Sequence, residues 1–208
     1  MFVALIVATA VVAAADWWAV GTDNRRAEYV FKPLTMVVLI AATLVLSDPV
    51  SDVARWAFVA ALVFSLLGDV FLMLEDHFVE GLASFGVGHL CYIVGLGAFG
   101  LNWLLVGVGV VMVISMVFMI GRPVVRGAGE HDARLTVPVA AYMTVISIMV
   151  AAAWGTAVPI ALVGALLFYG SDACIGWSRF VAPFPHHRLW IITTYHLGQI
   201  GLVLALAT

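Results

Sequence analysis

The sequence predicts an all-α membrane protein, a polytopic bundle of eight transmembrane helices. Hydrophobic residues make up 64% of the 208 residues, and charged residues only 10%. A soluble domain carries about 25% charged residues, so this chain has too little polar surface to cover a globule in water. Apolar runs near the ~20 residues that a helix needs to cross a bilayer recur along the whole chain. They lack the alternation of a membrane β-barrel.

The predicted spans follow one another through short connectors that leave no room for a separate soluble domain. Residues 1–208 are therefore predicted to form one transmembrane domain. Lys32 and Pro33 are expected to open the second span, because proline suits the first turn of a helix. In chain order the spans are residues 2–20, 31–47, 53–74, 81–100, 102–121, 135–153, 157–177 and 189–207.

The positive charges alternate with these spans. Only Arg55 lies on the side of the chain termini. By the positive-inside rule, the other side is cytoplasmic, and both termini are expected on the non-cytoplasmic side of a bacterial cytoplasmic (inner) membrane. The remaining Lys and Arg residues flank the connectors after the first, third, fifth and seventh spans: Arg25, Arg26, Lys32, Arg122, Arg126, Arg134, Arg179 and Arg188.

Residues 1–20 have a second interpretation, as a cleaved signal peptide. The stretch "ATAVVAAAD" contains small residues of the kind found at cleavage sites. The positively charged n-region of a signal peptide is missing, however. Cleavage would also leave Arg25, Arg26 and Lys32 outside, against the charge rule. A first transmembrane span is therefore the preferred interpretation.

Polar residues inside the spans gather at one depth. Asp69 and Asp172 lie near the cytoplasmic ends of the third and seventh spans, both of which run inward. Ionisable residues inside a membrane are candidates for a functional site, so the pattern predicts one polar cavity that opens towards the cytoplasm. Spans that start from the cytoplasm add further polar residues at a similar depth: Lys32, His89, Tyr92, Tyr195, His196 and Gln199.

Small and polar neighbours accompany the two aspartates. Ser65 lies four residues before Asp69 and shares its helix face. Gly170 and Ser171 come directly before Asp172, where small residues let neighbouring backbones come close. A purely structural alternative is that both aspartates pair with Lys32 or with histidines and lock the helices together.

A short internal repeat relates the two halves of the chain. The third span contains "ALVFSLLGD" and the seventh "ALLFYGSD", while the fourth contains "HLCYI" and the eighth "HLGQI". These matches suggest a 4+4 parallel repeat about an axis along the membrane normal. Asp69 and Asp172 would then face each other across the centre of the bundle.

Five segments together resemble the YhhN-like lysoplasmalogenase family: "FKPLTM" (31–36), "FSLLGDVFLML" (64–74), "GLASFGVGHLCYI" (81–93), "GALLFYGSD" (164–172) and "TYHLGQ" (194–199). The resemblance covers most of the chain in order and includes the eight-span layout. It implies hydrolysis of the vinyl ether bond of lysoplasmalogens (lysoplasmenylcholine or lysoplasmenylethanolamine) to a fatty aldehyde and a glycerophospho-base. It also implies functional roles for Lys32, Asp69, His89, Tyr92, Asp172, Tyr195 and Gln199.

Two carboxyl groups in a poorly solvated site suit this reaction, which needs a proton at the alkene carbon and then attack by water. Burial disfavours ionisation, and two nearby carboxyl groups do not both ionise easily. We therefore expect one of Asp69 and Asp172 to be the acid, while the other stays charged, stabilises the oxocarbenium ion and orients water. Glycoside hydrolysis offers a parallel.

Other candidate residues surround this expected pair. Lys32 at the cytoplasmic mouth is expected to hold the phosphate of a lysophospholipid substrate as a compact positive charge. The expected partners are this substrate and membrane lipids, without nucleic acid, and the oligomeric state stays open. The remaining substrate-binding or supporting candidates are Ser65, His89, Tyr92, Ser171, Tyr195, His196 and Gln199.

Two other functions compete with this interpretation. A metal-dependent lipid hydrolase would use His89, His196 and the aspartates, but the sequence has no HExxH motif and no clear third histidine; neither a metal nor a cofactor is predicted. A proton-coupled transporter or lipid carrier would use the same groups as a relay. Against that, the polar residues occupy one leaflet, and the span prolines lie near span starts rather than in broken central helices.

Overall fold

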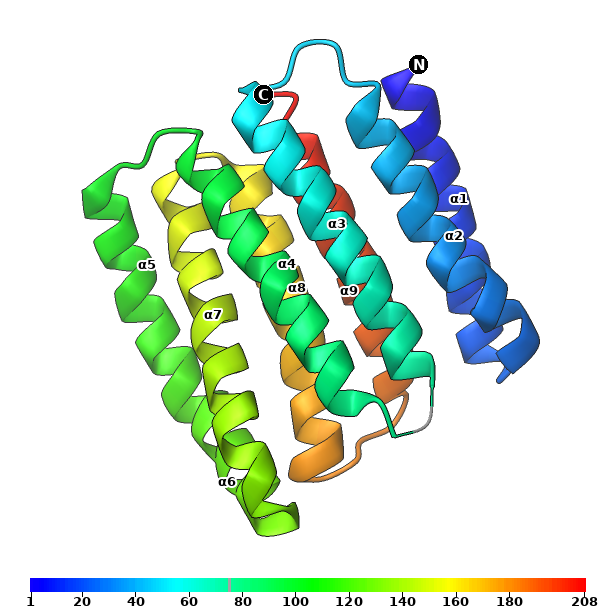
Figure 1. Cartoon of the computed structure of the whole chain (residues 1–208), viewed down its shortest axis with the longest axis vertical. Coiled ribbons are helices and arrows are strands. Elements are labelled where there is room, and N and C mark those ends of the chain that lie inside the picture. The colour runs from blue at the N-terminus through cyan, green and yellow to red at the C-terminus, as the bar shows by residue number, and fades with distance from the viewer. Residues whose placement is uncertain (75) are drawn as a thin grey trace.

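The computed structural model describes residues 1–74 and 76–208, and these form a bundle of long helices (Figure 1). A π-helical segment, Val117–Gly121, joins α5 to α6, and a short 3-10 helix, Ala133–Leu135, leads into α7. The described residues contain no strand, which confirms the all-α prediction. The α-helices are α1 (Phe2–Gly21), α2 (Arg25–Leu44), α3 (Asp52–Met73), α4 (Phe78–Gly97), α5 (Trp103–Met116), α6 (Arg122–His131), α7 (Thr136–Gly155), α8 (Pro159–Phe180) and α9 (His187–Ala205).

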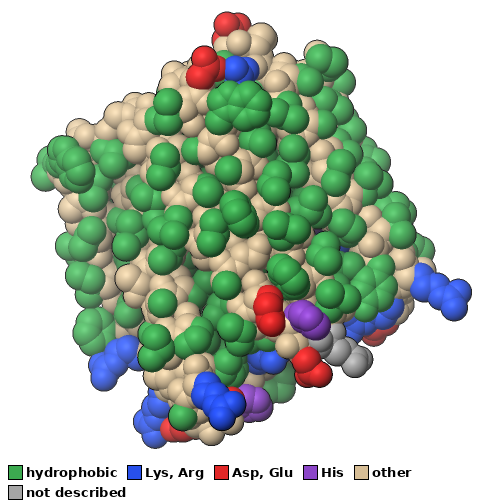
Figure 2. Space-filling view, viewed as in Figure 1, with side chains coloured by type: hydrophobic (Ala, Val, Ile, Leu, Met, Phe, Trp, Pro, Cys, Tyr) green, Lys and Arg blue, Asp and Glu red, His purple; other side chains and the backbone are tan. Residues whose placement is uncertain are grey.

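The helices run up and down, and both termini lie at the same end of the bundle (Figure 1). The connectors that carry nearly all of the Lys and Arg residues lie at the other end, called here the basic end. Figure 2 shows a broad hydrophobic surface between the ends, with charged side chains mostly towards them. This is the surface that a bilayer requires. The assignment of the basic end to the cytoplasm stays a prediction.

Seven segments of the described chain are long and apolar enough to cross a membrane. They are α1 to α4, the continuous segment Trp103–His131, Ala133–Gly155 and α8. The chain is therefore a multi-pass membrane protein. The eighth predicted span, α9, occupies its expected place beside α8, but His187, Arg188 and Gln199 lower its mean hydropathy, and it is not among the seven.

The start of α2 differs from the prediction. The helix begins at Arg25, because the Asn24 side chain caps it by accepting a hydrogen bond from the Ala27 N–H at 3.2 Å. Lys32 and Pro33 therefore do not open the helix, and Pro33 lies inside it. The shift places Lys32 on a regular helical turn that faces α3.

The fifth span also exceeds its predicted bounds of 102–121. It continues through the π-helical turn and α6 as far as His131. A π turn inserts an extra residue into a helix, and it lies directly before Arg122. The next residue, Pro123, does not end the helix, because it occupies the first turn of α6, where proline is tolerated.

Close packing of α8 against α9 depends on two glycines. A Cβ atom added to Gly164 would lie 2.7 Å from the Leu202 nitrogen and 2.9 Å from the Gly198 carbonyl oxygen. Backbones this close require residues without side chains. The close approach predicted at Gly170 is wrong, because an added Cβ there meets nothing within 4 Å.

We expect Gly164→Ala to destabilise the protein, because the methyl group has to push two backbones apart. Overpacking of this kind lowers the free energy of unfolding by about 1–3 kcal/mol. Gly170→Ala on the same helix is the matched control and should be neutral or slightly stabilising, since alanine favours a helix. Thermal denaturation in detergent micelles compares the two. Equal midpoints for both variants would contradict the packing argument.

Candidate active site

The first polar cluster joins α2, α3 and α9. Lys32 Nζ lies 3.0 Å from Asp69 Oδ1, and the Tyr195 hydroxyl donates to Asp69 Oδ2 at 2.7 Å. The Asp69 side chain is 2% exposed and that of Lys32 14%. A buried charge needs a partner of opposite sign and further hydrogen bonds, and each oxygen of Asp69 has one such partner. Lys32 is thus engaged with Asp69 and is not free at the mouth.

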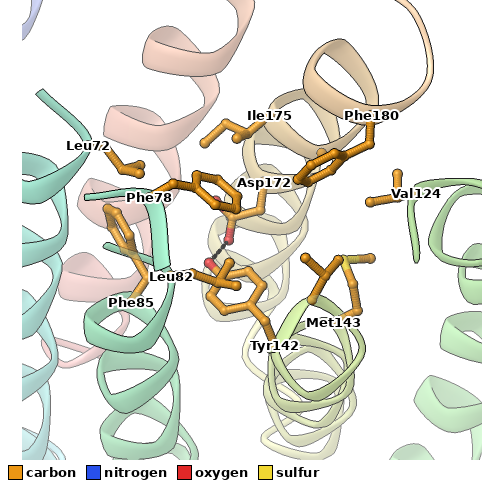
Figure 3. A pocket seen from close by; sticks show the side chains of 12 residues that line it. Leu72, Phe78, Leu82, Phe85, Val124, Tyr142, Met143, Asp172, Ile175 and Phe180 are labelled. Atoms are coloured by element: carbon orange, nitrogen blue, oxygen red, sulfur yellow. Dashed lines mark hydrogen bonds between the residues drawn. The ribbon is translucent and has the colours of Figure 1, made fainter. Parts of the chain in front are cut away.

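The second polar cluster joins α4, α7 and α8 around Asp172. The Tyr142 hydroxyl donates a hydrogen bond to Asp172 Oδ2 (Figure 3). His89 Nε2 lies 3.2 Å from the same carboxylate oxygen and 2.9 Å from the Tyr142 oxygen. His89 is fully buried and Tyr142 is 9% exposed. Both hydrogen bonds reach Oδ2, so Asp172 Oδ1 has no hydrogen bond from the described residues.

Asp172 lines a narrow apolar pocket at the basic end, with a cavity volume of about 30 Å³. Among the described residues that line this pocket, Asp172 is the only charged one. Figure 3 shows aromatic and aliphatic side chains surrounding Asp172 and Tyr142. The apolar lining comes from Leu72, Phe78, Leu82, Phe85, Val124, Val139, Met143, Ile175, Gly176 and Phe180.

Aromatic rings pack between the two clusters. The ring centroid of Phe168 lies 4.7 Å from that of His89 and 5.3 Å from that of Tyr195. No hydrogen bond among the described residues joins Asp69 to Asp172, although the two are close enough for their charges to interact. The structure therefore brings both aspartates into one region of the bundle, in two clusters with separate partners.

Three other predicted residues take two different places. The Tyr92 hydroxyl donates to Gln199 Oε1, and both side chains are fully buried. His196 Nδ1 accepts a hydrogen bond from the Trp17 indole nitrogen at 3.2 Å, which ties α9 to α1. These three predicted residues lie near the clusters but contact neither aspartate through a hydrogen bond among the described residues.

The two predicted serines do not reach the carboxylates. The Ser171 hydroxyl donates to the Ile191 carbonyl oxygen at 3.0 Å and so joins α8 to α9. Ser65 Oγ is buried and has no hydrogen-bond partner among the described residues. Its position four residues before Asp69 places it against α4, where a Cβ added to Gly88 would lie 3.3 Å from it.

Two polar residues of this region were missed by the sequence analysis. Tyr142 lies about two turns into its span from the basic end and completes the Asp172 cluster. Asp16 lies about one turn from the end of α1 that belongs to the basic end, is fully buried, and has no hydrogen-bond partner for either oxygen among the described residues. Both share the depth of the predicted residues, so the same depth criterion would have found them.

The two buried histidines face different neighbours. His89 belongs to the Asp172 cluster, whereas His196 bonds to Trp17 on α1. Within residues 1–74 and 76–208, no three His, Cys, Asp or Glu side chains gather in a way that would hold a metal ion. Asp172 is thus a buried carboxyl group with two hydrogen-bonding neighbours, His89 and Tyr142.

Comparison with known proteins places this arrangement in a family. The family model described as YhhN family matches residues 27–206. The chain belongs to the YhhN family. The matched segment contains Lys32, Asp69, Asp172 and all of their hydrogen-bond partners described above, whereas Asp16 on α1 lies outside it. No solved structure matches the chain.

Several curated proteins are similar to this YhhN-family chain. Human lysoplasmalogenase TMEM86B (Homo sapiens) is 32% identical over 154 residues, covering 70% of this chain and 61% of that protein. Lysoplasmalogenase TMEM86A of Bos taurus is 34% identical over 158 residues, with 69% and 62% covered. A lysoplasmalogenase of Mycobacterium tuberculosis is 34% identical over 166 residues, with 77% and 62% covered. The chain thus spans about three fifths of the length of these relatives.

We expect Lys32→Met to destabilise the fold strongly, because it leaves the buried Asp69 carboxylate without its cation. Removing one partner of a buried ion pair lowers the free energy of unfolding by about 3–5 kcal/mol. The double variant Lys32→Met/Asp69→Leu should recover most of that loss, since it leaves no unpaired charge. Denaturation in detergent micelles measures both. A double variant as unstable as Lys32→Met would show that the ion pair is not the cause.

Proposed function

We propose that this protein is a membrane-embedded hydrolase that cleaves the vinyl ether bond of lysoplasmalogens to a fatty aldehyde and a glycerophospho-base. The observation that carries the proposal is a buried carboxyl group, Asp172, that faces an apolar pocket and is held by Tyr142 and His89. Relatives named lysoplasmalogenase support the choice of substrate. The reaction needs an acid beside the hydrocarbon chain of the substrate, and Asp172 is such an acid.

Asp172 is the general acid in this proposal. The protonated carboxyl group gives its proton to the alkene carbon, and the electron pair of the double bond forms the new C–H bond. The neighbouring carbon and the ether oxygen then share the positive charge of an oxocarbenium ion. Because Tyr142 and His89 both engage Oδ2, Oδ1 is the oxygen left to face the substrate.

Water completes the reaction. It attacks the oxocarbenium carbon and passes a proton to a base. We assign this base to His89 or to the Asp172 carboxylate, which has just given its proton to the alkene carbon. The resulting hemiacetal then breaks its bond to the glycerol oxygen. That oxygen takes the proton that the base has just received, and the hemiacetal hydroxyl gives its own proton to the Asp172 carboxylate as the C=O bond of the aldehyde forms. The products are the aldehyde and the glycerophospho-base, and the protein returns to its starting state.

The surroundings of Asp172 suit a cationic intermediate. The rings of Phe78 and Phe85 line the pocket, and aromatic faces attract cations. Asp69, whose charge is offset by Lys32, adds a carboxylate on the far side of the Phe168 ring. In this proposal Asp69 organises α2, α3 and α9, while Asp172 carries the proton.

The proposed location follows from the charge distribution. Eight of the nine Lys and Arg residues flank the connectors of one end, and the positive-inside rule assigns that end to the cytoplasm. We propose a bacterial cytoplasmic membrane with both termini on the opposite side. The Asp172 pocket would then open towards the cytoplasmic leaflet.

We expect Asp172→Asn to lower kcat for aldehyde release by about 10²–10⁴-fold, because it removes the general acid. Tyr142→Phe should show a smaller loss, since it removes one hydrogen bond to Asp172. Purified protein in detergent is assayed with a lysoplasmalogen, and the matching ester lysolipid tests bond specificity. Asp48→Asn, an exposed carboxylate at the other end, is the control.

Two results would contradict this proposal. Folded wild-type protein that releases no aldehyde would exclude the substrate. Activity lost on treatment with EDTA and restored by zinc would point to the metal-dependent alternative, because the acid chemistry of Asp172 needs no metal.

A further inference from the structure

We propose that the lysolipid binds with its phosphate at Arg179 and its alkenyl chain in the groove between α4 and α7, which holds the vinyl ether at Asp172. This inference rests on the proposed function and assigns the two ends of its substrate. It also replaces the expected role of Lys32, whose ammonium group is paired with Asp69.

Arg179 is the arginine that adjoins the Asp172 pocket. Its guanidinium carbon lies 4.1 Å from the ring centroid of Phe78 and 5.8 Å from that of Phe180. Both rings line the pocket that contains Asp172. The Arg179 side chain is exposed and has no ion pair with the described residues. Its charge therefore stands at the mouth of the pocket, held in place by two aromatic rings.

Several other cations of the basic end have ion-pair partners, and no other unpaired arginine of the described residues stacks on a ring that lines the Asp172 pocket. Arg188 binds Asp23 and Glu28, each at 2.6 Å, and Arg126 binds Glu130 at 2.8 Å. Arginine suits a phosphate better than a point charge does, because its planar fork donates two parallel hydrogen bonds. Arg179 has no ion-pair partner among residues 1–74 and 76–208 and can donate both hydrogen bonds to a phosphate.

The distance from Arg179 to Asp172 matches the polar part of a lysoplasmalogen. The two residues are seven apart on α8, which places them on one face and about 10 Å apart along the helix axis. In the substrate, seven covalent bonds separate the alkene carbon that takes the proton from the phosphorus atom. Extended chains of such bonds span roughly 1.2 Å per bond, or roughly 8 Å in all. A phosphate at Arg179 thus brings this carbon to Asp172.

The alkenyl chain of the substrate lies in a groove that begins beside the Asp172 pocket. Leu82 and Tyr142 line both the Asp172 pocket and a second hollow between α4 and α7 on the outer face of the bundle. This hollow is apolar along its length, with Val79, Gly86 and Leu90 from α4 and Pro138, Ala141 and Val145 from α7. From Val79 to Leu90 the groove runs about 16 Å along the helix axis. A lipid tail matches its apolar lining and its direction.

This pose keeps the substrate in its ordinary membrane orientation. The phosphate lies at the level of the basic end, and the chain runs towards the bilayer centre beside the helices. The lysolipid would enter sideways from the leaflet between α4 and α7, past Leu82 and Tyr142. No part of it has to turn over in the membrane.

The placement of the phosphate is tested with Arg179→Gln. Arg126→Gln, which changes another arginine of the basic end, is the matched control. For a lysoplasmalogen, Arg179→Gln should raise KM at least tenfold while changing kcat less than threefold, and Arg179→Lys should recover part of the loss. With 1-alkenylglycerol, which lacks the phosphate, wild type and Arg179→Gln should behave alike. Equal effects of Arg126→Gln and Arg179→Gln would overturn the assignment and indicate general attraction of anionic lipid.

The chain arm is tested by filling the groove with Gly86→Leu. A Cβ at this position meets only Tyr142 Cδ2, at 3.7 Å, so the backbone there leaves room for a side chain to begin. It should raise KM at least fivefold for a substrate with a sixteen-carbon alkenyl chain. The KM for a substrate with a four-carbon chain should stay unchanged. Gly97→Leu, in open space on the same helix, is the control. Equal effects on both chain lengths would overturn the groove as the chain site.

Binding without turnover separates this inference from the proposed reaction. A 1-alkyl lysophospholipid cannot be cleaved as a vinyl ether, and its binding should raise the thermal midpoint of the wild-type protein. Arg179→Gln should abolish most of that shift, and Arg126→Gln should keep it. If no aldehyde forms but this pattern appears, the pose holds and the reaction is wrong. If aldehyde forms but Arg179→Gln keeps the full shift, the pose is wrong and the reaction holds.

Discussion

A carboxylate in the hydrocarbon layer has to find its partners within the protein, and this requirement organises the bundle. Asp69 takes its partners from α2 and α9, while Asp172 takes them from α4 and α7. Two buried carboxyl groups thereby tie together six helices. The cost of leaving either group unpaired in a membrane is high, so the same contacts that hold reactive groups in place also hold the helices in register.

Much of this architecture was predictable from residue types and their depth. The depth of the polar residues gathered Asp69, Asp172 and all of their partners except Tyr142 into one region, because polar residues are so rare in the spans that their positions are informative. It gave no information on which groups pair, since pairing depends on the rotation of each helix about its axis. Asn24 shows a second limit: one capping side chain starts α2 six residues early and turns Lys32 towards Asp69.

The internal repeat stays a prediction, and one contact joins equivalent positions of its two halves. Tyr92 and Gln199 hold equivalent positions in "HLCYI" and "HLGQI", and their side chains bond to each other. Equivalent residues of two halves meet when they lie near the axis that relates them. Each aspartate also bonds to a residue of the other half, Asp69 to Tyr195 and Asp172 to His89. A parallel duplication would explain why one site has two carboxyl clusters, of which the Asp172 cluster alone lines the apolar pocket.

The long helix from Trp103 to His131 connects the candidate site with the lipid bilayer around the protein. A helix of 29 residues is about 43 Å long, whereas the hydrocarbon core is about 30 Å thick. Its last third, α6, therefore reaches into the head-group layer, where mismatch with the bilayer is relieved by tilting or bending. Val124 on α6 is a wall of the Asp172 pocket. We expect thinning or thickening of the bilayer to act on that wall and so to make the width of the pocket depend on lipid composition.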